Sequence, residues 1–242
     1  ENLRFYSEEL DNSKIFAKTL SKHSDVYIND AFGTSHREHA SNSAILSFFK
    51  IKGIGFLMEK ELTYLSKLEL NKNKLTLLLG GAKVSTKLSM IKFFLDKADY
   101  ILIGGGMAFT FLKALGYNIG KSLYEKTMYE EAVNIIKLSE NSKTQLIFPE
   151  DFLCSTSLES NDSNYRQANA LNDSDMGFDI SDKTINNFST IIEKSNCLVW
   201  NGPLGVFEKE KYSTGTRKIA EKIVSLTEDN LLISVVGGGD TA

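Results

Sequence analysis

Five runs of apolar residues lie along the chain after residue 74, and a turn and a helix-like stretch follow all but the last of them. The runs cover residues 75–79, 100–103, 145–148, 196–200 and 231–236. They lack the regular polar alternation of half-exposed strands, which is typical of strands buried on both faces of a parallel sheet. In the intervening stretches apolar residues recur every three or four positions, which predicts amphipathic helices. This alternation predicts βαβ units, a parallel sheet and right-handed crossovers.

The part of the chain before residue 72 shows a shorter version of the same pattern. Residues 13–24 are expected to form a helix with Ser13 as its N-cap, and residues 25–30 a strand. From residue 53 to residue 70 the apolar spacing predicts one long helix. We therefore expect an α/β protein with two domains. They would be residues 1–52 and 72–242, with an interdomain helix over 53–71 between them.

One stretch breaks the alternation of strands and helices. Between residues 152 and 175 the chain is polar, rich in Ser, Asn and Asp, and without a period. This composition predicts a loop excursion. Both ends of the chain also interrupt a pattern, since it opens near the end of a strand-like segment and stops where a helix is expected. We therefore expect a portion of a longer protein.

Turns that contain glycine follow four of the five apolar runs, at Gly80, Gly104, Gly202 and Gly239. In a parallel sheet these turns meet at one edge, where α/β proteins bind their ligands. Glycine lets the backbone approach a ligand closely, and free N–H groups at a helix start favour an anion. One such turn is weak support, but four at one edge favour a ligand that carries phosphate.

Two lysines follow the first of these turns. In the segment LTLLLGGAKVSTK, Lys83 and Lys87 lie four residues apart, and hence on one face of the helix expected over residues 83–98. Like charges at this spacing repel each other, and a phosphate between them would reverse the sign of the interaction. The alternative is that both are ordinary solvated lysines. Neither the P-loop nor the Gly-x-Gly-x-x-Gly fingerprint occurs at this turn.

A second cationic pair is expected in the first part of the chain. Arg4 follows a strand-like segment, and Arg37 lies in the loop after the strand over residues 25–30. If both strands are parallel, the two guanidinium groups lie at one sheet edge, where they suit a phosphate or a carboxylate. The alternative is a solvated loop, which also carries His36 and His39.

Composition narrows the class of protein. The 242 residues are 42% hydrophobic and 24% charged, as in ordinary soluble globular proteins. A formal net charge of −3 gives no electrostatic support for binding nucleic acid or an anionic membrane. No apolar run approaches the length of a membrane span. Cys154 and Cys197 are too few for a disulfide framework, which favours a reduced, intracellular setting.

Six segments taken together resemble one known family, phosphoglycerate kinase. In chain order they are NDAFGTSHREHASN, GFLMEKEL, LLLGGAKVSTKL, LIGGGMAFTFLKALGYNIGKSL, VWNGPLGVFE and GGGDTA. The resemblance implies two Rossmann-like domains with parallel sheets, the N-terminal one incomplete, that close about the long helix joining them. It implies reversible glycolytic transfer of a phosphoryl group between ATP and the carboxylate of 3-phosphoglycerate, with 1,3-bisphosphoglycerate and ADP on the other side. It also implies Mg²⁺ bound with ATP or ADP, a cytoplasmic location and a monomer.

The resemblance also implies roles for individual residues. Arg4 and Arg37 match arginines of the phosphoglycerate-binding patch. Lys83 is expected to neutralise charge on the transferred group, with Lys87 and Gly239 as further catalytic residues. Asp240 is the expected magnesium ligand, through the nucleotide, although outside this context it would be an ordinary N-cap. The nucleotide contacts are expected from Gly80, Ala82, Lys83, Lys87, Gly104, Gly105, Leu123, Gly177, Phe178, Asn201, Pro203, Val206, Glu208, Gly238, Gly239, Asp240 and Thr241.

Some features depart from the family pattern and keep other functions open. Phe178 stands where the family usually has Leu, residues 152–175 match poorly, and the family's opening strands and last glycine-rich turn are not found. One alternative is therefore a non-catalytic fragment that binds ATP or ADP without turnover. Another is a dinucleotide-dependent oxidoreductase, which is disfavoured because no Gly-x-Gly-x-x-Gly follows a strand.

Overall fold

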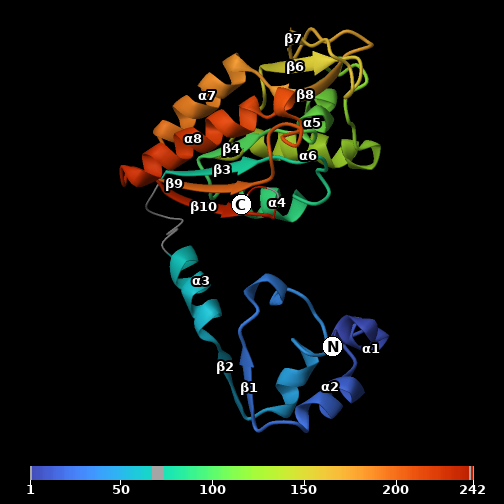
Figure 1. Ribbon diagram of the computed structural model, residues 1–242, viewed down its shortest axis with the longest axis vertical. Helices are drawn as coiled ribbons and strands as arrows, with labels where there is room; N and C mark the ends of the chain where they lie inside the picture. The colour runs from blue at the N-terminus through green and yellow to red at the C-terminus, as the bar shows by residue number, and fades with distance from the viewer. Residues whose placement is uncertain (1, 67–73, 240, 242) are drawn as a thin grey trace. The chain divides into compact units, whose positions relative to one another are not determined.

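The computed structural model describes residues 2–66, 74–239 and 241. It divides the chain into two compact units, Glu1–Lys67 and Leu68–Ala242, called unit 1 and unit 2 below (Figure 1). Each unit has its own cluster of buried apolar residues. The finer division into 1–52, 53–71 and 72–242 stays a prediction. Within the described ranges, no helix combines the length and the apolar character that crossing a bilayer requires.

Unit 1 is built from short elements around a two-stranded parallel sheet. Its elements are η1 (Leu3–Phe5), α1 (Ser7–Leu10), α2 (Lys14–Ser21), β1 (Val26–Asn29), η2 (Phe32–Thr34), η3 (Ala44–Phe48), β2 (Ile51–Ile54) and α3 (Phe56–Ser66). β1 pairs with β2 in parallel. Ser13 caps α2 as expected, because its hydroxyl oxygen accepts a hydrogen bond from the Phe16 N–H. Ala17, Ala40, Ile45 and Phe49 form the buried cluster.

Two expectations for unit 1 need correction. Arg4 lies in the 3-10 helix η1, where a strand end was expected. The long helix begins at Phe56 and not at residue 53, because Gly53 and Ile54 belong to β2, which the helical spacing concealed. The expected end of that helix, after residue 66, lies outside the described residues.

Unit 2 contains the predicted parallel sheet. Its strands are β3 (Leu75–Leu79), β4 (Tyr100–Ile103), β5 (Gln145–Ile147), β9 (Cys197–Asn201) and β10 (Ile233–Gly237). They lie in the order β10-β9-β3-β4-β5, and each neighbouring pair is parallel, which confirms the α/β class. The central strand β3 is buried along its whole length, as its unbroken apolar sequence predicts.

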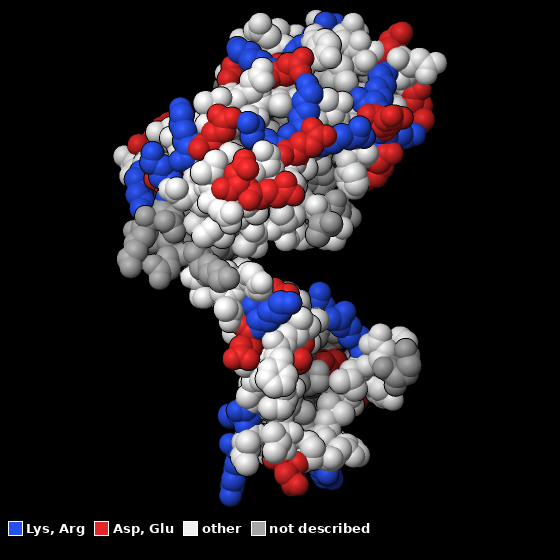
Figure 2. All heavy atoms as spheres, turned by 60° about the vertical axis from the view of Figure 1, so that its left-hand side comes forward, with Lys and Arg blue, Asp and Glu red and all other residues white. Residues whose placement is uncertain are grey.

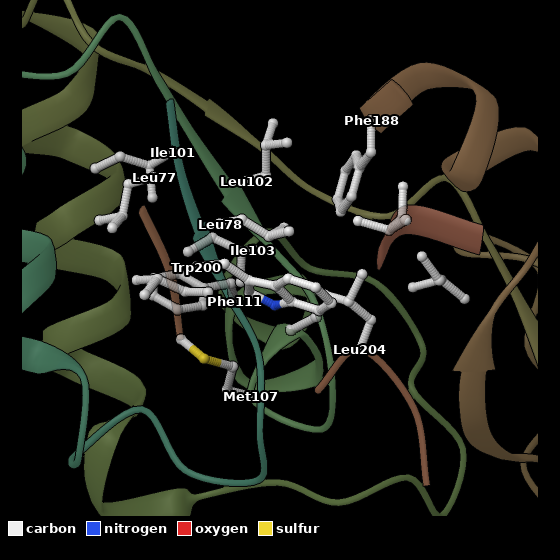
Figure 3. Close-up of a cluster of buried hydrophobic side chains, with 14 of the residues drawn as sticks. Leu77, Leu78, Ile101, Leu102, Ile103, Met107, Phe111, Phe188, Trp200 and Leu204 are labelled. Carbon is white, nitrogen blue, oxygen red and sulfur yellow. The ribbon is translucent and has the colours of Figure 1, made fainter. Parts of the chain in front are cut away.

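Helices cover this sheet and complete its core. They are α4 (Leu88–Phe94), α5 (Ala108–Ala114), α6 (Tyr129–Glu140), α7 (Asp182–Glu193) and α8 (Thr214–Glu228), with η4 (Lys126–Met128) and η5 (Glu210–Tyr212). α5 packs on α6, and α7 packs on α8 above the sheet as Figure 1 draws it. Figure 3 shows side chains of β3, β4 and β9 packed with Met107, Phe111 and Leu204. This core holds the carboxyl ends of the strands in place.

The polar stretch over residues 152–175 is not a simple loop, so that prediction is wrong. β6 (Asp151–Ser155), β7 (Asn164–Gln167) and β8 (Met176–Ile180) form an antiparallel sheet in the order β7-β6-β8. Phe152 and Cys154 alternate with half-buried residues along β6 and pack into the core of unit 2. The short apolar alternation in β6 was masked by the polar turn residues around it.

This antiparallel sheet also fixes where two helices begin. Ser181 and Ser213 occupy the N-cap positions of α7 and α8, but neither side chain makes a capping hydrogen bond. The carboxylate of Asp151 in β6 accepts instead from the backbone N–H groups of Lys183 and Thr184. The carboxylate of Asp179 in β8 accepts from the Gly215 N–H at 2.7 Å. Both helices are therefore capped by aspartates from the neighbouring sheet.

One face of unit 2 carries charges of both signs. On the face seen in Figure 2, Lys and Arg side chains are interspersed with Asp and Glu. Lys218 pairs with Asp182 at 3.1 Å and Lys222 with Glu193 at 2.5 Å, so that ion pairs join α8 to α7. That face therefore presents no broad field of one sign.

Candidate functional site

The glycine turns of unit 2 meet at one edge of the sheet, as expected. Leu79, the last residue of β3, aligns with Ile103 of β4 and with Asn201 of β9. Asn201 in turn aligns with Gly237 at the end of β10. The turns that start at Gly80, Gly104, Gly202 and Gly238 therefore follow the same sheet edge.

These turns pack directly on one another. The Gly81 N–H donates to the Pro203 carbonyl oxygen at 2.7 Å, and the Met107 N–H donates to the Gly81 carbonyl oxygen at 3.0 Å. A Cβ atom on Gly80 would lie 2.1 Å from the Pro203 oxygen, and one on Gly105 would lie 2.6 Å from the Gly81 nitrogen. Glycine is thus needed at both positions because backbone approaches backbone.

An apolar cavity of about 430 Å³ opens beside the turns and is called the apolar cavity below. Phe109 and Phe152 pack together there with ring centroids 4.5 Å apart and ring planes tilted by 33°, and Phe178 packs on Tyr212 at 4.9 Å with a tilt of 38°. The cavity brings together many of the expected nucleotide residues, namely Ala82, Gly105, Leu123, Gly177, Phe178, Pro203, Val206 and Glu208. Glu208 is exposed among them. An apolar cavity with a carboxylate in its lining suits a flat base attached to a sugar.

A second cavity, of about 260 Å³, adjoins the first and is called the lysine cavity. The two share Gly81, Ala82 and Pro203 in their linings. The lysine cavity also brings together the expected residues Lys83, Lys87, Asn201, Gly238 and Thr241. An apolar end joined to a cationic end is the arrangement that a nucleotide requires, since its base is largely apolar and its phosphates are anionic.

The two lysines do not share a helical face, so that part of the prediction is wrong. Helix α4 has seven residues and begins at Leu88, which leaves Lys83 in a loop and Lys87 at the N-cap. Val84 in this loop is fully buried, and its carbonyl oxygen accepts a turn hydrogen bond from the Lys87 N–H at 2.9 Å. Residues 83–87, called the lysine loop below, nevertheless bring both ammonium groups to one cavity. There the Lys87 ammonium donates a hydrogen bond to the Asn201 side-chain oxygen.

Three expected residues line neither cavity, and a fourth lies outside the described residues. Gly80 and Gly104 line neither cavity. They allow close packing between the turns instead, since a Cβ on Gly104 would lie 2.5 Å from the Leu204 side chain. Gly239 is exposed and lines neither cavity. Asp240, the expected magnesium ligand, lies outside the described residues.

Sequence reasoning missed Asp179, which lines the apolar cavity although only 2% of its surface is exposed. Burial raises the pKa of its carboxyl group to about 7, opposed by hydrogen bonds from the Gly215 and Ile180 N–H groups. The Gly205 turn also lies close to Asp179, because a Cβ on Gly205 would be 2.2 Å from the Asp179 Oδ1 atom. One signal in the sequence was available: an acidic residue stands inside the apolar strand MGFDI. Burying a carboxylate is costly unless it accepts hydrogen bonds, so such a residue is expected to have specific partners.

Two aromatic residues of the apolar cavity were also missed. Phe109 lies in α5 and Phe152 in β6, and both are buried at 2% exposure. Each fits the pattern of an ordinary core residue in its own element. Their ring contact at the cavity therefore depends on tertiary packing, which a local sequence pattern does not predict.

Unit 1 contains a small polar cavity of about 270 Å³. Arg4 and His39 line it, whereas the expected partner Arg37 does not. The Glu9 carboxylate, 3% exposed, accepts hydrogen bonds from the Ser41 N–H and hydroxyl and lies 3.8 Å from His39 Nδ1. The Asn42 amide donates to the Arg37 carbonyl oxygen. The buried Glu9 and the half-buried Asn42 therefore hold parts of the loop after β1, while Arg37 itself is exposed.

Comparisons with known proteins agree with this geometry. The family model described as phosphoglycerate kinase matches residues 1–242. A phosphoglycerate kinase of Finegoldia magna is 44% identical over all of this chain, and a cytosolic one of Triticum aestivum is 40% identical. The solved phosphoglycerate kinase of Coxiella burnetii superimposes with a TM-score of 0.86 over 99% of this chain at 35% identity. That of Pyrococcus horikoshii gives 0.78 at 29% identity.

The chain spans less than two thirds of the length of these relatives. The chain covers 60% of each of these two sequences and 61% and 62% of the two solved chains. The family model nevertheless spans the whole of this sequence, and both units lie within it. The chain belongs to the phosphoglycerate kinase family.

Proposed function

We propose that this chain carries the nucleotide site and part of the substrate site of an enzyme that moves a phosphoryl group between ATP and the carboxylate of 3-phosphoglycerate. In the glycolytic direction, 1,3-bisphosphoglycerate and ADP give 3-phosphoglycerate and ATP. The observation that carries the proposal is the junction of an apolar cavity with a lysine cavity at the carboxyl ends of parallel strands. Family membership supports the same reaction.

The two cavities suggest one orientation for the nucleotide. The base would lie in the apolar cavity beside Leu123 and Phe178, and the Glu208 carboxylate would accept hydrogen bonds from the ribose hydroxyls. The phosphates would extend past Ala82 and Pro203, which both cavities share, toward Lys83 and Lys87. The terminal phosphate would then lie at the cationic end.

The chemistry asks for positioning and charge neutralisation more than for a protein nucleophile. The ammonium groups of Lys83 and Lys87 would offset the negative charge that spreads over the transferred group. Mg²⁺ prefers oxygen ligands and is commonly held by one or two carboxylates together with substrate phosphates. We propose Asp240 as that carboxylate, supported by its neighbours Gly238 and Thr241, which line the lysine cavity.

The substrate would bind unit 1. Guanidinium groups suit phosphate and carboxylate, so Arg4 and Arg37 remain our candidates for phosphoglycerate contacts. Closure about the proposed interdomain helix would bring substrate and nucleotide together and exclude water. We also propose a cytoplasmic monomer; the relatives of Triticum aestivum and Trypanosoma congolense are named cytosolic, and one of Arabidopsis thaliana chloroplastic.

Calorimetric titration of the chain with MgADP tests the nucleotide site. We expect saturable binding that weakens at least tenfold in Lys83→Ala, because an ammonium group near the phosphates is lost. Lys143→Ala is the matched control, since Lys143 is exposed and lines neither cavity. Absence of MgADP binding by the folded chain, or preference for NAD, would contradict the proposal.

A coupled turnover assay separates the kinase from a fragment that only binds nucleotide. The assay supplies MgATP and 3-phosphoglycerate and follows formation of 1,3-bisphosphoglycerate through a coupling enzyme. Turnover that disappears in Lys83→Ala supports catalysis by the chain. Saturable MgADP binding without turnover would support the binding-only alternative.

A further inference from the structure

The lysine loop is held by a carboxylate that is distant in sequence. The Ser85 hydroxyl donates to one oxygen of Glu125 at 2.5 Å, and the Ser85 N–H donates to the other at 3.1 Å. Ser85 lies midway between Lys83 and Lys87 in the chain. Both oxygens of a single carboxylate are therefore committed to the middle of the lysine loop.

Glu125 is suited to this contact by its charge. Burial alone would raise the pKa of its carboxyl group, but hydrogen bonds from Ser85 and from the Val84 backbone, together with the Lys83 charge, lower it below the ordinary value. The group is therefore ionised at neutral pH, and hydrogen bonds to an ionised acceptor are the stronger kind.

The segment that carries Glu125 is itself anchored. The Glu125 N–H donates to the hydroxyl oxygen of Thr110 at 3.1 Å, and Thr110 is 1% exposed in α5. Two residues earlier in the same segment, Leu123 lines the apolar cavity. A few residues thus contribute both a wall of the apolar cavity and a restraint on the lysine loop.

The loop needs such a restraint because the helix holds only its last residue. α4 starts at Leu88, and the Lys87 carbonyl oxygen accepts a hydrogen bond from the Ile91 N–H at 2.9 Å, whereas Lys83 lies five residues before the helix. Other contacts that fix the loop are the buried Val84 side chain and the hydrogen bond from the Thr86 hydroxyl to the Lys83 carbonyl oxygen. Among the contacts of the loop, the hydrogen bonds from Ser85 and from the Val84 backbone to Glu125 reach the segment beside the apolar cavity.

We propose that Glu125 is a positioning residue for the phosphate end of the nucleotide site. Acting through Ser85, it holds Lys83 and Lys87 at a fixed distance from the wall that includes Leu123. The inference rests on the proposed nucleotide function and deepens it. Glu125 would thus affect binding of the phosphates and not of the base, although its own segment borders the apolar cavity.

Paired titrations with MgADP and with adenosine test this assignment. Adenosine fills the apolar cavity but carries no phosphate to reach the lysines. In Glu125→Ala we expect MgADP to bind roughly five- to tenfold more weakly, the loss typical of hydrogen bonds to a charged group at a partly exposed site. We expect adenosine affinity to stay within about twofold of that of the unchanged chain. A merely structural role would weaken both ligands together.

Three further variants sharpen the comparison. Glu125→Gln retains an oxygen for the Ser85 N–H and an amide near its hydroxyl, so it should recover part of the lost MgADP affinity. Ser85→Ala removes only the hydroxyl bond and should show a smaller loss in the same direction. Glu131→Ala is the matched control, because Glu131 lies in α6, pairs with Lys92 at 2.6 Å and lines neither cavity.

The outcomes distinguish this inference from the function on which it rests. If the unchanged chain binds no MgADP, the proposed function fails. If it binds MgADP and Glu125→Ala binds equally well, or loses adenosine to the same extent, the positioning role is overturned. If circular dichroism shows that Glu125→Ala does not fold, Ser85→Ala decides the question, and normal MgADP affinity in it overturns the role.

Discussion

Asp179 is a buried carboxyl group held between β8, the Gly205 turn and the start of α8. It makes two hydrogen bonds to backbone N–H groups, which offset part of the cost of burying its charge. Because the hydrogen bonds offset the cost only in part, the proton is held more tightly in the folded chain. The pH dependence of stability should therefore carry its signature.

We expect Asp179 to make the chain less stable as pH rises toward neutrality. Its pKa is 3.8 in an unperturbed state and about 7 when folded, so between these values the folded state binds a proton that the unfolded state has released. A raised pKa gives stability below the unfolded value, which is lost as pH rises through the folded value. Relative to Asp179→Asn, the free energy of unfolding should fall by on the order of 2–3 kcal/mol between pH 5 and 7.5.

Urea denaturation of both proteins at the two pH values measures this difference. Taking the difference between the chain and Asp179→Asn cancels the titration of other groups that the variant leaves unchanged. A difference that does not change with pH would show that Asp179 titrates in its ordinary range.

At the residue scale, the sequence predicted which residues line the site more successfully than it predicted the contacts that position them. Lys83 and Lys87 do line one cavity, but from a loop that ends at the N-cap of α4 and not from one helical face. Asp179 was missed because one of its two hydrogen-bond partners, Gly215, lies 36 residues away in α8, and the Gly205 turn that covers it is also distant in sequence. Such contacts are set by tertiary packing, which a local periodicity does not encode.

At the scale of elements, the capping of α7 gives a matched pair of variants. Asp151 accepts from the Lys183 and Thr184 N–H groups and from the Thr184 hydroxyl, whereas the N-cap residue Ser181 makes no side-chain cap. Asp151→Ala should lower the free energy of unfolding of unit 2 by about 1–2 kcal/mol, as loss of a good cap does. Ser181→Ala should change it by less than about 0.5 kcal/mol. Urea denaturation measures both changes. Equal losses of unfolding free energy in the two variants would show that Asp151 is not the residue that caps α7.

Elements were predicted well where one period dominates and poorly where elements are short. The unbroken apolar run at Leu75–Leu79 predicted a buried strand, and this strand is the centre of the sheet. The last two residues of β2, Gly53 and Ile54, were included in the helix predicted over residues 53–70, because a strand of four residues shows too little alternation to be recognised. β6 and β7 were hidden by the polar turn between them, since four or five residues hold little more than two periods.

At the scale of the whole molecule, two separate buried clusters predict two unfolding transitions. The single tryptophan, Trp200, is buried in unit 2, so its fluorescence reports on that unit alone. Circular dichroism reports on both units. We expect MgADP at a hundred times its dissociation constant to stabilise unit 2, and hence the transition seen by fluorescence, by about 2.7 kcal/mol. The second transition seen by circular dichroism, which reports the unfolding of unit 1, should not shift. Coincidence of the two signals at all ligand concentrations would show that the units unfold together.

The packing of the glycine turns has a consequence for how an anion is held. The N–H groups of Gly80, Gly81 and Gly104 donate to backbone carbonyl oxygens, and that of Gly202 donates to the Thr241 hydroxyl oxygen. These donors are already used within the protein, so long-range attraction to the ammonium groups must supply more of the binding. Such attraction is screened by dissolved ions, whose Debye length shortens from about 10 Å at 0.1 M to about 3 Å at 1 M. Affinity for ADP should therefore fall steeply with ionic strength while affinity for adenosine stays nearly level, as titrations in rising potassium chloride would measure.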